Sequence, residues 1–202
     1  MKRLAILVAV AVAVLAGATC ASAEPKPASH IPGDAPAGLY VLDKSHASLT
    51  VSLSHMGLSH YTMRFNVLDA SFSYDPKAPD ASKVEATIDA NSLDVGNAKV
   101  SAAFAHDFLA AEEHPKITFV ATAIQYTGDH GTMTGDLTLR GQTRPVTLDV
   151  TFNGTGPGLL GGHRMGFSAN GDIKRSDFGS TAWRSVVGDE VHVVIEAEFQ
   201  RK

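Results

Sequence analysis

Hydrophobic and polar residues alternate along most of the chain between positions 41 and 199. Alternation of this kind places apolar side chains on one face of a β-strand and polar side chains on the other. The clearest example is 191–199, where every second residue is apolar. Seven similar segments precede it, around residues 47–55, 63–74, 84–90, 117–123, 133–139, 146–152 and 165–173. Eight such strands predict an antiparallel β-barrel whose inward residues either pack solid or enclose one apolar ligand.

The segment 63–74 changes parity within its length. Met63 and Phe65 occupy odd positions, whereas Phe72 and Tyr74 occupy even ones. A slip of one residue inside a long strand predicts a β-bulge, which bends the strands of barrels.

One stretch follows a different period. Val100, Phe104 and Phe108 recur every four residues in an alanine-rich segment, which is the spacing of a helix. Pro115 ends this segment because proline cannot continue a helix. The predicted fold class is therefore mainly β, an eight-stranded antiparallel barrel with a short helical insertion at about 97–114 that lies over a mouth or side of the barrel.

The first 23 residues have the pattern of a secretory signal peptide. Lys2 and Arg3 precede an uncharged run at 4–15, and Ala21-Ser22-Ala23 forms a cleavage site. We expect cleavage after Ala23 and a location in the periplasm or outside the cell. A retained anchor is less favoured, because the apolar run is shorter than the roughly 20 residues of a spanning helix. Lipid modification of Cys20 is a second alternative, but the usual leucine three residues earlier is missing.

Residues 24–38 contain four prolines among small residues, which predicts a flexible leader before a barrel domain at 39–202. The chain after Ala23 has 15 basic and 21 acidic residues, a formal charge of −6, and no cysteine. No disulfide can then form, so packing must stabilise the fold. We expect no nucleic-acid partner, because no basic stripe is present.

Residue types typical of catalysis occur without the spacing that catalysis needs. Nine histidines are present, but no cysteine or carboxylate cluster completes a metal site. Asp43, Ser45 and His46 include the residue types of a catalytic triad, yet neighbours along a regular strand point to opposite faces. We therefore expect no catalytic and no metal-binding residues. Arg175, Asp177 and Arg184 are consistent either with ion pairs at a barrel rim or with contacts to a ligand head group.

A series of short motifs resembles the YceI-like family. They are Tyr40–Ala47, Ser54–Ser59, Arg64-Phe65, Asn91–Asn97, His114–Phe119, Gly135–Val146, Arg175–Gly179 and Val187–Val191. Each fragment alone is weak, but together they follow the order and spacing of the family over residues 39–199. The stretch 98–106 departs from the family pattern, which usually has an Arg-Asp pair and then His-Leu there.

This resemblance implies a lipocalin-like eight-stranded barrel in the periplasm that holds a long isoprenoid chain. The implied ligands are polyprenyl lipids and ubiquinone-type quinones, with no other cofactor. We interpret the protein as a binding or carrier protein and expect no enzymatic activity. The candidate cavity-lining residues are Leu53, His55, Met63, Phe65, Phe104, Phe108, Leu109, Phe119, Met133, Leu137, Phe167, Phe178 and Trp183.

Two alternatives remain open from the sequence. A barrel enzyme acting on a hydrophobic substrate needs His46, His55 or Asp177 to point into the cavity beside a partner group. A solid-core, stress-related module needs no cavity at all. The sequence also leaves open whether two barrels associate as a homodimer.

Overall fold

The computed structural model describes residues 27–159 and 161–202. The signal peptide expected at 1–23 lies outside the described residues. The strands are β1 (Gly38–His55), β2 (Ser59–Phe65), β3 (Leu68–Tyr74), β4 (Lys83–Asp89), β5 (Leu93–Asp94), β6 (Lys116–Thr127), β7 (His130–Leu139), β8 (Gln142–Pro157), β9 (His163–Lys174) and β10 (Val187–Arg201). The helices are α1 (Ala98–Leu109) and the short 3-10 turns η1 (Pro32–Asp34), η2 (Pro79–Ala81), η3 (Ala90–Ser92) and η4 (Arg175–Phe178).

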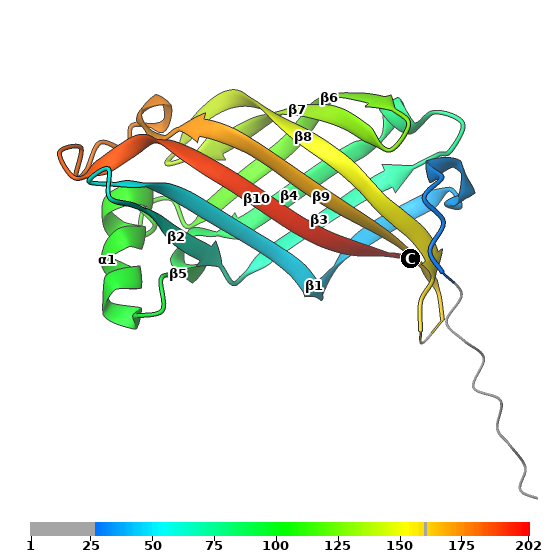
Figure 1. Ribbon diagram of the computed structural model, residues 1–202, viewed down its shortest axis with the longest axis horizontal. Helices are drawn as coiled ribbons and strands as arrows, with labels where there is room; N and C mark the ends of the chain where they lie inside the picture. Colours follow the sequence, from blue (N-terminus) through cyan, green and yellow to red (C-terminus); the bar gives the residue numbers. More distant parts are fainter. Residues whose placement is uncertain (1–26, 160) are drawn as a thin grey trace, which may run out of the picture.

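The sheet closes on itself. Antiparallel pairs run in the order β10-β9-β8-β7-β6-β4-β3-β1, and β10 also pairs with β1. These eight strands complete the barrel seen side-on in Figure 1, while β2 and the two-residue β5 extend it at one end. The predicted eight-stranded antiparallel barrel with one short helix is confirmed.

The parity slip in 63–74 marks a break between two strands, so the predicted bulge is wrong. β2 pairs with the second half of β1 and β3 with its first half, as one strand interrupted at Asn66 and Val67. The backbone amide of Asn66 donates to the Ser92 carbonyl (3.1 Å), and that of Val67 donates to the Ser92 hydroxyl (3.1 Å). Both halves therefore keep their apolar side chains inward.

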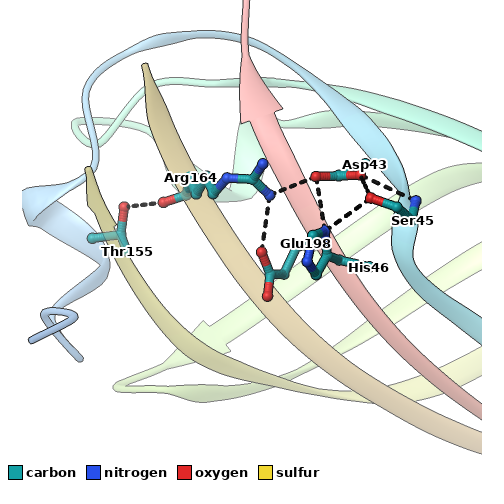
Figure 2. Close-up of polar contacts among 6 residues, drawn as sticks. All are labelled: Asp43, Ser45, His46, Thr155, Arg164 and Glu198. Carbon is teal, nitrogen blue, oxygen red and sulfur yellow. Dashed lines mark hydrogen bonds and ion pairs between the residues drawn. The ribbon is translucent and has the colours of Figure 1, made fainter. Parts of the chain in front are cut away.

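A pronounced bulge lies in β1 instead. Leu42 pairs with Phe199 and Ala47 with Ala197, so the four residues 43–46 lie opposite the single residue Glu198. The regular alternation of side chains is lost in this bulge. The expectation that Asp43, Ser45 and His46 point to opposite faces is consequently wrong, and their side chains gather in one place (Figure 2).

Helix α1 lies beside β2 and β5 at one end of the barrel (Figure 1). The Asn97 side chain accepts hydrogen bonds from the Lys99 and Val100 amides and so caps the start of the helix. The helix ends earlier than the predicted 114, because Ala110 adopts a left-handed conformation that closes its last turn. No helix in the described ranges is long and apolar enough to cross a membrane.

The opposite end of the barrel is covered by residues 29–36, which we call the leader segment. Ser29 forms an antiparallel bridge with Thr155, and Ala35 is only 1% exposed. The Tyr40 hydroxyl donates to the Pro36 carbonyl (2.8 Å) and the Tyr74 hydroxyl to the Pro32 carbonyl (2.7 Å). The part of the chain expected as a flexible leader is thus packed against the barrel from Ser29 onward.

Candidate functional site

The barrel encloses a cavity of about 320 Å³. Its walls come from all eight ring strands, from β2, and from two residues of α1. Two clusters of buried side chains lie along it, one around Leu53, Phe65 and Phe178 near α1, and one around Tyr40 and Phe72 near the leader segment. The interior is therefore hollow and almost entirely apolar, as expected of a site for a hydrocarbon ligand.

Most of the predicted lining residues border this cavity. They are Leu53, Met63, Phe65, Phe108, Leu109, Phe119, Met133, Leu137 and Phe167. His55, Phe104 and Trp183 instead line a second pocket of about 220 Å³, which shares Leu53, Met63 and Phe108 with the first. Phe178 borders neither and is buried in the core cluster near α1.

Sequence reasoning missed several lining residues. Val191, Val193, Ile195 and Ile173 follow the same alternation as the predicted set, so the pattern itself could have found them. Tyr126 and Ser180 also line the cavity, but no periodicity identifies them, and Arg175, already considered for contact with a ligand head group, lines it as well. Their placement depends on how β6 and the loop after β9 meet the barrel ends.

The α1 end of the cavity is lined by aromatic rings. Tyr61 lies 5.7 Å from Phe104, and Phe104 lies 5.0 Å from Phe108, measured between ring centroids. Trp183 is 56% exposed and donates from its indole Nε1 to Asp107 Oδ2 at 2.9 Å. Hydrogen bonds from His106 and Trp183 hold the pKa of Asp107 below its usual range. Asp107 therefore joins α1 to the loop between β9 and β10.

Arg175 is a buried cation at the same end, with only 4% of its surface exposed. Its guanidinium donates to the carbonyls of Gly188, Ser180, Ala182 and Val187 at 2.8–3.2 Å. Burial lowers its pKa from the ordinary arginine value. Among the described residues Arg175 forms no ion pair of the kind considered for it, Asp177 and Arg184, and it instead fixes the residues that follow η4.

The leader-covered end holds a dense aromatic cluster. Tyr40 stacks on Phe72 with 5.1 Å between ring centroids, and Phe72 meets Phe199 edge-on at 4.9 Å. Tyr126 borders this cluster, and burial raises the pKa of its phenol to about 12. Its hydroxyl is buried and has no hydrogen-bond partner among the described residues.

Figure 2 shows the polar cluster in the β1 bulge. None of its residues lines the cavity. Arg164 Nη1 contacts Asp43 Oδ2 at 2.7 Å and Glu198 Oε2 at 3.0 Å. The Ser45 hydroxyl donates to Asp43 Oδ1, while His46 Nδ1 lies 3.0 Å from both Ser45 Oγ and Asp43 Oδ2. A Ser-His-Asp triad uses both ring nitrogens of its histidine, one facing the serine and the other the aspartate, whereas His46 meets both Ser45 and Asp43 through Nδ1 alone. The cluster joins β1, β9 and β10 and does not form a catalytic relay.

None of the groups proposed for a barrel enzyme lies in the main cavity. His46 belongs to the polar cluster, His55 lines the second pocket, and Asp177 is exposed on η4. Within residues 27–159 and 161–202, no three histidine, cysteine or acidic side chains form a group suited to a metal ion. The cavity offers a ligand mainly apolar contacts. A few polar residues lie at its ends.

Comparison with known proteins shows a matching family and similar proteins. A family model described as YceI-like domain matches residues 40–199. A UPF0312 protein of Pectobacterium atrosepticum is 37% identical over 173 residues, which cover 84% of this chain and 90% of that protein.

Two solved structures have the same architecture. BcnA of Burkholderia cenocepacia has a TM-score of 0.70 and 28% identity, covering 78% of this chain and 98% of that chain. A polyisoprenoid binding domain from Saccharophagus degradans, implicated in plant cell wall breakdown, has a TM-score of 0.62 and 17% identity. It covers 81% of this chain and 98% of that domain, and at this identity the similarity shows the fold alone.

Proposed function

The chain belongs to the YceI-like domain family, and on that premise we propose that its barrel binds a long isoprenoid lipid, either a polyprenyl chain or a ubiquinone-type quinone. The hollow interior is the observation that carries the proposal, because a barrel of this fold with a solid core has no room for a ligand. The name of the polyisoprenoid binding domain with the same fold supports this choice of ligand class.

The lining of the cavity favours binding over catalysis. Each CH₂ group removed from water contributes about 0.8 kcal/mol, so several isoprene units give strong binding without any charged contact. Met63, Met133 and Met165 line the cavity, and methionine side chains adapt to an irregular, branched chain. We propose a carrier or a store of lipid rather than an enzyme.

The expected signal peptide supports a role in the periplasm or outside the cell. An isoprenoid exposed to water in such a compartment would aggregate or partition into a membrane, because its surface is apolar. A barrel that encloses it keeps it dispersed. No cofactor beyond the bound lipid or quinone is part of this proposal, and the homodimer stays a prediction.

The test is to identify what the protein carries. The full chain, with the expected signal peptide at 1–23, is expressed in a bacterial host that makes isoprenoid quinones. It is then purified without detergent and extracted with organic solvent. We expect mass spectrometry to find a polyprenyl lipid or quinone in a fixed ratio to protein. Repeated preparations that release no isoprenoid, or that release mixed phospholipid in its place, would count against the proposal.

A further inference from the structure

Three large apolar side chains are exposed at the α1 end of the barrel. Met56 (61% exposed) and Leu58 (82% exposed) lie on the turn between β1 and β2, and Trp183 lies on the loop between η4 and β10. The Met56 amide donates to the Val186 carbonyl (2.8 Å), and the Val186 amide donates to the Trp183 carbonyl (2.9 Å), so the two loops are joined. Both project at the end where α1 lies (Figure 1). We call Met56, Leu58 and Trp183 the mouth patch.

The mouth patch adjoins the apolar interior. Trp183 and Val186 line the second pocket, which shares Leu53, Met63 and Phe108 with the main cavity. Trp183 is at the same time more than half exposed. An apolar lining therefore leads from the main cavity to the surface at the α1 end. A hydrocarbon chain that follows this lining contacts apolar side chains in place of water.

The two loops of the mouth patch carry no acidic residue. Residues 55–60 and 179–187 contain one formally charged side chain, Arg184, which is exposed. Asp107 and Asp189, which lie near these loops, each already accept a side-chain hydrogen bond. Tryptophan is enriched where a bilayer meets water, and arginine pairs well with phosphate groups. The composition of the loops is therefore suited to the headgroup region of a phospholipid bilayer.

The leader-covered end is less suited to a bilayer. Ile31 (63% exposed) and Leu159 (94% exposed) lie there, but the leader segment covers that end of the barrel. The turns at that end also carry four exposed carboxylates, on Asp34, Asp75, Asp80 and Asp129. Acidic side chains resist transfer toward the hydrocarbon of a membrane. The two ends thus differ in charge and in access to the cavity, although both expose apolar side chains.

Resting on the proposed function, we propose that the mouth patch docks the barrel onto a phospholipid bilayer, with the second pocket facing the lipid. Met56 and Leu58 then enter the boundary between headgroups and acyl chains, where the apolar area removed from water supplies the binding energy. The isoprenoid passes between bilayer and cavity at the α1 end without crossing water.

The test uses Trp183 as the reporter, because it is the only tryptophan of the chain. Lipid-stripped protein is mixed with vesicles of phosphatidylethanolamine and phosphatidylglycerol, whose acyl chains are brominated in one set so that they quench a tryptophan in contact with them. The mouth variant is Met56→Ser with Leu58→Ser, and the matched control is Ile31→Ser with Leu159→Ser. All four side chains are exposed, so both variants should unfold thermally as the wild type does.

Two further measurements concern the cargo. The first follows the rate at which hexaprenol, an isoprenoid alcohol, moves from vesicles to the protein. The second determines hexaprenol affinity by native mass spectrometry in the absence of vesicles. Neither Met56 nor Leu58 lines either pocket, so we expect this affinity to be the same in the mouth variant and the wild type.

We expect brominated vesicles to quench Trp183 in the wild type and in the control. In the mouth variant, vesicle affinity should fall about tenfold or more, because two apolar side chains no longer leave water, and hexaprenol transfer should slow accordingly. Unquenched Trp183 in the wild type, as when the patch binds a protein instead, would overturn the inference, and so would an equal loss in the control. Docking without any uptake of hexaprenol would instead contradict the proposed function.

Discussion

The guanidinium carbon of Arg175 lies 5.5 Å from the centroid of the Phe108 ring, so the loop after β9 rests directly on helix α1. A cation over an aromatic face is attracted to it, more strongly where water is excluded. The same guanidinium donates to the carbonyls of Ser180 and Ala182 in that loop and of Val187 and Gly188 at the start of β10. Arg175 therefore joins the loop, β10 and α1 at this end of the cavity.

Replacing Arg175 by methionine should destabilise the barrel strongly. The substitution keeps an apolar side chain of similar length but leaves four carbonyls without their donor. We expect a loss of about 3 kcal/mol or more in the free energy of unfolding, measured by urea titration. Arg144→Met is the matched control, because Arg144 is exposed and, among the described residues, its side chain bonds to the carbonyl of its neighbour Thr143 alone. Equal stability of the two variants would contradict the role assigned to Arg175.

The bond between Trp183 and Asp107 should restrain α1. Trp183→Phe keeps an aromatic ring in the second pocket and removes only the donor to Asp107. Because the bond is partly exposed, we expect a local cost of about 1 kcal/mol or less and up to about fivefold faster amide exchange in α1. Hydrogen-exchange mass spectrometry measures this, with β7 as the internal reference. Unchanged exchange in α1 would show that Trp183 does not restrain the helix.

The polar cluster in the β1 bulge should make stability depend on acidic pH. Hydrogen bonds from Ser45 and Arg164 hold the pKa of Asp43 far below its ordinary value. The folded state therefore favours the carboxylate, and this contribution is complete above the unfolded pKa of about 4 and is lost as the pH falls below it. Asp43→Asn should lose stability less steeply than the wild type between about pH 4 and pH 2.

The control for this comparison is Asp80→Asn, at an exposed position in η2. It should follow the wild-type curve of unfolding free energy against pH. Parallel curves for Asp43→Asn and the wild type would mean that Asp43 contributes nothing specific in the folded state.

The sequence predicts the strands of the barrel well, because their burial on one face leaves a regular pattern. The strand around Val191 and Phe199 is amphipathic because one face meets the cavity, so its alternation is visible without a structure. The bulge at 43–46 escapes prediction, since its polar side chains satisfy one another and Arg164 rather than follow a period.

The residues at the two ends of the cavity are even harder to predict from the sequence. Arg175 stands in a recognisable motif, yet its burial depends on the loop folding back onto α1. The Tyr126 hydroxyl is buried without a partner among the described residues, and the alternation of β6 does not reveal this. Local sequence patterns predict which face of a strand is buried. The surroundings of Arg175 and Tyr126 instead depend on contacts between residues that are far apart in the sequence.

Filling the cavity should abolish lipid binding without unfolding the barrel. Ala86 and Ala169 line the cavity from β4 and β9, so phenylalanine at both positions occupies space that the lipid needs. We expect at least a tenfold loss of hexaprenol affinity, on the order of 1.4 kcal/mol or more, with the circular dichroism of the wild type retained. Val120→Phe, on the exposed side of β6, is the control that adds the same ring outside. Full binding by the filled variant would place the ligand elsewhere.

A crystal structure of protein purified with its native lipid would show whether the barrel encloses an isoprenoid. We expect continuous, elongated electron density in the cavity that reaches toward the apolar space beneath α1. A cavity that holds only separate water molecules, in protein that was never exposed to detergent or solvent, would contradict it.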